Sequence, residues 1–178
     1  MGLERLRSIV PPPAEPLEAG AADQWPRVEG ELGTALPEDF KRFTELYGSG
    51  TFDEFLYLLN PFAADPAGNL LAARDTMLKG YAETRAKFPD RLPIPPWPEP
   101  GGLLPLGRTD NANELYWLTG DEPSAWPVVA FTGRSTQHEV HHHPVTDFLA
   151  LLLSGKLPTK VFPDSFLHRG SHRFVPST

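Results

Sequence analysis

The segment His138-Glu139-Val140-His141-His142 matches the H-E-x-x-H pattern, in which two histidines bind zinc and the glutamate acts as general base of a peptidase. That chemistry needs a helix, because only there do residues four apart lie on one face and reach one metal ion. Here Pro144 follows the match and disfavours helical angles at His143. In a strand, His138 and His142 would stand about 13 Å apart, too far for a shared zinc ion. We therefore predict a strand rather than a metalloprotease site.

Such a strand would place Glu139, His141 and His143 on one face, so incidental metal binding stays an open alternative. The interpretation we favour is a polar edge strand, whose titratable side chains discourage pairing with another sheet. The carboxylates that follow, Asp147 and Asp164, supply a third zinc ligand poorly. We expect no metal and no cofactor.

Patterns for other catalytic chemistries are missing. Gly48-Ser49-Gly50 lacks the G-x-S-x-G context of a nucleophile elbow, and Gly155-Lys156 lacks the remaining residues of a phosphate-binding loop. Asp53 and Glu54 are sequence neighbours, so on a strand their side chains would point to opposite faces and could not act as an acid/base pair. Adjacent carboxylates of this kind are typical of a solvated turn. The chain contains no cysteine, which excludes disulfides, thiolate metal sites and a thiol nucleophile. The sequence predicts no catalytic residue and no enzyme.

Acidic residues in two loops are the candidates for a binding function. Asp110 and Glu114 border the first loop, and Asp121 and Glu122 lie in the second. The net charge of −7 at pH 7 means that phosphate backbones repel the protein and basic proteins attract it. We expect these residues to contact a basic protein partner, and ordinary solubilising charge is the alternative.

Trp97 is the further candidate for partner binding. It lies in the proline-rich connector 93–101, where it is less easily buried than the other tryptophans. An exposed tryptophan can act as the anchor of a protein interface. Trp25 and Trp117, on apolar faces of expected elements, are predicted to lie in the core instead.

These residues must be positioned by helices and strands that the sequence also predicts. Apolar residues at helical spacing predict helices at 25–32, 38–47, 70–88 and 145–152. Aromatic and aliphatic runs predict strands at 52–59, 103–107, 114–118, 128–131 and 139–143. Pro37, Glu38 and Asp39 mark the start of the second helix, and Gly48 its left-handed end.

This order of elements predicts an α+β fold, with helices packed on one face of a single antiparallel sheet. We expect residues 24–165 to form the domain, residues 1–23 a peripheral helix and arm, and residues 166–178 a basic tail that is mobile from Gly170. No apolar run resembles a secretory signal or is long enough to span a membrane. We therefore expect a cytoplasmic location.

Five motifs occur in the order typical of one protein class. They are Trp25, Leu36-Pro37-Glu38-Asp39-Phe40, Tyr47-Gly48-Ser49-Gly50, the Gly107-Arg108-Thr109 turn before the strand of Trp117, and Trp126-Pro127-Val128. Over roughly residues 25–162 the chain resembles the SUKH superfamily, which is related to a yeast cell-wall-synthesis regulator of the Knr type. The resemblance implies helices on one face of a strongly twisted antiparallel sheet.

The resemblance also implies a function. Bacterial SUKH proteins are largely immunity proteins that bind and neutralise a cognate polymorphic toxin, often a nuclease. We therefore expect a non-enzymatic immunity protein that binds a basic toxin domain, without contacting nucleic acid or a membrane directly. The alternative is an intracellular regulatory scaffold that binds a protein partner without any toxin.

Overall fold

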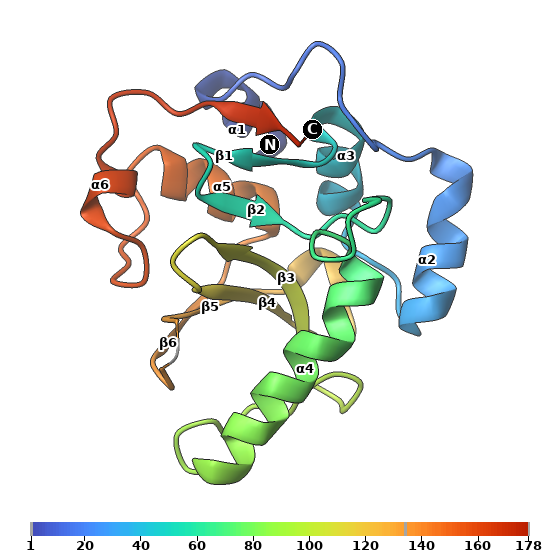
Figure 1. The fold of residues 1–178 in the computed structure, drawn as a ribbon, viewed down its shortest axis with the longest axis vertical. Coiled ribbons are helices and arrows are strands. Elements are labelled where there is room, and N and C mark those ends of the chain that lie inside the picture. Colours follow the sequence, from blue (N-terminus) through green and yellow to red (C-terminus); the bar gives the residue numbers. More distant parts are fainter. Residues whose placement is uncertain (1, 134, 178) are drawn as a thin grey trace.

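The computed structural model describes residues 2–133 and 135–177 (Figure 1). Within this part of the chain, six α-helices accompany one seven-stranded sheet. The helices are α1 (Gly2–Ile9), α2 (Trp25–Leu32), α3 (Glu38–Tyr47), α4 (Leu70–Lys87), α5 (Val145–Leu153) and α6 (Asp164–Leu167). The strands are β1 (Gly50–Phe52), β2 (Leu56–Leu58), β3 (Leu103–Thr109), β4 (Glu114–Leu118), β5 (Val128–Phe131), β6 (His138–His141) and β7 (Phe174–Pro176).

The strands form an open sheet in the order β6-β5-β4-β3-β2-β1-β7, and every neighbouring pair is antiparallel. Strands β3 to β6 follow one another as a meander, as expected for strands joined by short loops. The predicted α+β class with a single antiparallel sheet is confirmed. None of the helices in residues 2–133 and 135–177 is long and apolar enough to cross a membrane.

Both faces of the inner strand β4 are covered. Tyr116 and Trp117 are neighbours and therefore point to opposite faces, yet both are 0% exposed. Trp117 contacts Phe40 of α3, with ring centroids 4.9 Å apart, whereas Tyr116 lies 5.9 Å from Tyr81 of α4. Helix α3 packs against α5, and α1 packs against both. These three helices lie on one face of the sheet, and α4 covers the other (Figure 1). From the sequence, the helices were expected on one face only.

Asp39, near the start of α3, connects this helix to α5. Asp39, in the first turn of α3, accepts hydrogen bonds from both the backbone N–H and the hydroxyl of Thr146 at 2.9 Å. Thr146 lies in the first turn of α5, so the carboxylate stands near the positive ends of two helices. The acidic residue that marks the start of α3 in the sequence thus also fixes the position of α5.

Helix α1 and Val10 belong to the core, although they lie in the segment 1–23 that was expected from the sequence to be peripheral. Leu6 and Val10 are 0% exposed, and the Val10 carbonyl accepts a hydrogen bond from the Tyr47 hydroxyl at 2.6 Å. Further along, the Leu17 carbonyl lies so close to Gly48 that a Cβ atom there would collide with it. Gly48 has the positive φ of 65° expected at the end of this helix, but its ψ of −151° lies outside the left-handed helical region that the sequence predicted. Burial of the apolar side of α1 against α5 explains why α1 packs inward, whereas residues 11–23 are exposed or half-buried.

Two predictions about strands are wrong. The expected strand 52–59 is a hairpin of β1 and β2, in which Asp53 and Glu54 have φ values of 56° and 59°. The end of the expected mobile tail forms β7, which pairs with β1. Phe174 of β7 lies 5.2 Å from the ring of Tyr47, so aromatic packing attaches this strand to the core.

Candidate protein-binding surface

The four acidic loop residues predicted to bind a partner lie at opposite ends of β4. Asp110 and Glu114 are at its start, whereas Asp121 and Glu122 follow its end. Asp110 is exposed, but Glu114 is half-buried and accepts a hydrogen bond from the Tyr116 hydroxyl at 2.6 Å. Burial, reinforced by the carboxylate of Glu114, raises the pKa of Tyr116 well above its ordinary value. Glu114 is therefore engaged by a buried side chain of the protein itself. The four predicted residues do not form one surface.

The structure instead brings the second acidic loop together with the connector that contains Trp97. Antiparallel pairing of Leu103 with Leu118 places the chain before β3 beside the chain after β4. Thr119 fixes this arrangement, because its N–H and its hydroxyl both donate to the Gly102 carbonyl, at 3.0 and 2.8 Å. Asp121 and Glu122 thus lie at the same end of the sheet as Trp97.

Glu99 is the residue at this end that the sequence interpretation missed. It is exposed in the turn between Trp97 and β3, where the Glu99 carbonyl accepts a hydrogen bond from the Gly102 N–H. The signal was present, since a turn before one antiparallel strand must lie beside the loop after its partner. We call Trp97, Glu99, Asp121 and Glu122 the acidic end surface.

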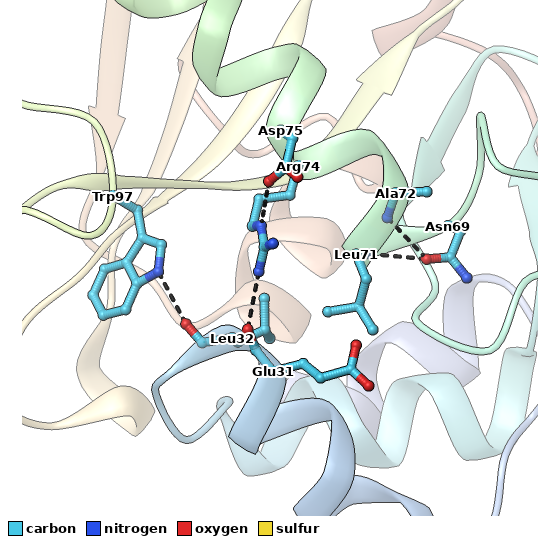
Figure 2. A network of polar contacts seen from close by, with 8 residues as sticks. All are labelled: Glu31, Leu32, Asn69, Leu71, Ala72, Arg74, Asp75 and Trp97. Atoms are coloured by element: carbon cyan, nitrogen blue, oxygen red, sulfur yellow. Dashed lines mark hydrogen bonds and ion pairs between the residues drawn. The ribbon is translucent and has the colours of Figure 1, made fainter.

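Trp97 is held in place by helix α2. Its indole N–H donates to the Leu32 carbonyl at 3.1 Å, at the C-terminal end of that helix (Figure 2). Arg74 of α4 donates to the neighbouring Glu31 carbonyl at 3.2 Å and pairs with Asp75. Trp97 is half-buried and packs against the core, so it is a fixed, partly accessible aromatic side chain rather than a fully exposed one.

The carboxylates of the acidic end surface are exposed and are not engaged by basic side chains among the described residues. Within residues 2–133 and 135–177, none of Glu99, Asp121 and Glu122 forms an ion pair. All three are exposed, and Glu122 accepts one hydrogen bond, from the Ser124 hydroxyl at 2.8 Å. Three like charges at one end of a sheet produce a negative field that attracts basic groups.

The histidine segment is a strand, as predicted, and β6 lies at an edge of the sheet. Its Glu139 is engaged by a neighbouring loop, since it accepts hydrogen bonds from the Thr159 hydroxyl at 2.6 Å and the Lys160 N–H at 2.7 Å. The part of the chain that the structure describes contains no group of three or more His, Cys, Asp or Glu residues able to hold a metal ion.

The structure also contains a buried pair of Asp53 with His172, which was not predicted from the sequence. Asp53 is buried rather than solvated, and one of its oxygens lies 2.5 Å from Nδ1 of His172. Its other oxygen accepts a hydrogen bond from the Arg173 N–H at 3.0 Å. The partners lie 119 residues apart in the chain, so no local pattern could have indicated this pair.

No protein-family model, curated protein sequence or solved structure matches this chain.

Proposed function

We propose that this chain is a non-enzymatic immunity protein, which binds a basic toxin domain through the acidic end surface and thereby blocks its activity. The observation that carries the proposal is that Glu99, Asp121 and Glu122, all exposed and without ion pairs in the described residues, lie at the same end of the sheet as the anchored Trp97. The proposed site of action is the cytoplasm.

The resemblance to the SUKH superfamily supplies the class of partner, and the surface supplies a physical means of recognition. Nuclease domains hold phosphates and are therefore often basic, so clustered carboxylates can occupy the same groups as the substrate backbone. Charges of this kind mainly accelerate association, whereas a tryptophan at an interface contributes to its lifetime. The surface combines both components.

The direct test is a pull-down of the purified protein against the product of the neighbouring gene, followed by an activity assay on that product. Stoichiometric binding that abolishes a toxic activity would support the proposal. If the locus contains no toxin-like gene and no binding occurs, the regulatory scaffold becomes the better interpretation.

A charge-matched pair of variants tests the surface itself. The variant E99Q/D121N/E122Q should associate at least about tenfold more slowly than the wild type, because it loses the steering field. The control E45Q/E83Q/D110N removes the same number of exposed carboxylates elsewhere and should associate at nearly the wild-type rate. Stopped-flow association at two salt concentrations provides the readout, since salt screens steering over about 10 Å. Equal slowing by both variants would contradict the assignment.

A further inference from the structure

A cleft of about 640 Å³ lies between α4 and the face of the sheet that carries Tyr116. It is separate from the acidic end surface and plays no part in the proposed function. Its walls come from α4, from the chain after this helix, and from the turn after β5. The lining includes Gly80, Tyr81, Phe88, Arg91, Arg108 and Phe131. A cleft of this volume is within the range of small-molecule sites.

The α4 side of the cleft is open because its residues there are small. Thr76, Gly80 and Thr84 recur every four residues and therefore form one stripe along the helix. A Cβ atom on Gly80 would meet no heavy atom within 4 Å, so packing does not require a glycine at this position. A glycine within a helix costs roughly 0.5–1 kcal/mol relative to alanine. The absence of a side chain here leaves space in the cleft.

The floor and rim of the cleft are apolar. The rings of Tyr81 and Phe131 lie 5.7 Å apart in an edge-on arrangement, and both residues are largely buried. Phe88 stands at the rim with 46% of its surface exposed, the largest value for a large hydrophobic residue in the described chain. These rings offer an aromatic or aliphatic group a place to leave water.

The polar groups of the cleft favour an anion. Arg108 lines the cleft, donates one bond to the Ala67 carbonyl at 2.6 Å, and has its guanidinium 5.9 Å from the centre of the Tyr57 ring. Arg91 is exposed, with its guanidinium 6.0 Å from the centre of the Phe88 ring. Among the described lining residues the one carboxylate, that of Glu114, already accepts a bond from Tyr116. Two guanidinium groups and one engaged carboxylate give this lining a positive balance, which favours an anionic ligand.

We propose that this cleft binds a small amphipathic anion, with an aromatic body against Tyr81, Phe88 and Phe131 and a carboxylate directed to Arg91 and Arg108. The anionic group distinguishes this ligand from a purely apolar one, because arginine recognises carboxylates through paired hydrogen bonds. The proposal does not depend on the immunity function, since it uses different residues.

The first test compares two probes that share a ring system and differ in charge. Calorimetric titration with 2-naphthoate should show one saturable site, and 2-naphthylmethylammonium should bind at least about tenfold more weakly. Absence of saturable 2-naphthoate binding up to about 5 mM, or equal binding of the two probes, would overturn the proposal.

Variants then locate the site. Gly80→Leu should reduce 2-naphthoate affinity at least about tenfold by filling the cleft, and Arg91→Gln should reduce it several-fold. Gly30→Leu is the matched control, because Gly30 is also an exposed helical glycine with no atom near its Cβ position, but it lies in α2 away from the cleft. Circular dichroism verifies that each variant is folded. Unchanged binding in both Gly80→Leu and Arg91→Gln, or an equal loss in Gly30→Leu, would overturn the assignment.

Discussion

The two edges of the sheet each contain a histidine–carboxylate pair, and the two pairs differ in burial and in what they hold together. At the β7 edge, the side chains of His172 and Asp53 are 3% and 1% exposed. At the β6 edge, the side chains of His141 and Glu139 are 8% and 26% exposed, and His141 Nε2 lies 3.2 Å from the carboxylate. The same two kinds of chemical group thus occur in a nearly dry environment and in a partly solvated one.

The other partners of each carboxylate explain the difference. Asp53 connects the β1–β2 turn to His172, 119 residues later, and to Arg173. It therefore attaches the segment before β7 to the rest of the sheet. The two carboxylate oxygens of Glu139 instead accept hydrogen bonds from Thr159 and Lys160. Its histidine partner, His141, lies on the same strand. We infer that the first pair stabilises the whole fold and that the second carboxylate mainly fixes one loop.

The largest expected effect is at Asp53. Asp53→Ala leaves His172 and the Arg173 N–H without their acceptor in a buried site, which should lower the free energy of unfolding by about 3–5 kcal/mol. Urea denaturation followed by circular dichroism measures the loss. Glu54→Ala is the control, because the pair of Glu54 with Arg173 is two-thirds exposed on both sides and should cost less than about 1 kcal/mol. A similar loss in both variants would show that the turn, and not the buried pair, determines stability.

An intermediate effect is expected at Glu139. Glu139→Gln preserves the size of the side chain but removes the charge that accepts two hydrogen bonds, so it should cost about 1–3 kcal/mol. The loss should be local: the Lys160 amide should exchange with solvent faster, while amides of β4 keep their protection. Uniform acceleration across the sheet would argue that Glu139 supports the fold as Asp53 does. His142→Gln, an exposed change beside the strand, is the matched control.

The contrast between the two edges also marks what the sequence could predict. The start and end of α3 and the limits of β4 follow from local patterns, namely Pro37 with its acidic neighbours and a run of apolar residues. The edge strand β6 follows likewise from its polar residues before Pro144. Each of these depends on residues close together in the chain, where capping and periodicity act.

The rest depends on contacts between distant segments. Nothing near Asp53 indicates that His172 will bury it, so the sequence favoured a solvated turn and a mobile tail. The acidic end surface was found in part, because Trp97 and Asp121 were recognised separately, while Glu99 joins them through the pairing of β3 with β4. The position of α4 could not be predicted for the same reason. Its apolar residues indicate a helix, but they do not indicate which face of the sheet it covers.

The smallest expected effect is a pH dependence at the β6 edge. Burial against Phe148 lowers the pKa of His141 below its ordinary value of 6.5, the charge of Glu139 opposes this shift, and His143 and His142 add to it. The folded protein therefore holds the proton less tightly than the unfolded chain. The contribution to stability is complete above about pH 6.5 and is lost as the pH falls below 6.5 toward the lower folded pKa. Urea denaturation across this range should show the decline, and His141→Gln should reduce it.

Glu139→Gln sharpens this last prediction, because it separates His141 from other causes of an acid-induced loss of stability. If His141 is responsible, removal of the Glu139 charge takes away the interaction that raises the pKa of His141, so the decline below pH 6.5 should become steeper. If the decline has an origin other than His141, Glu139→Gln should leave its steepness below pH 6.5 unchanged.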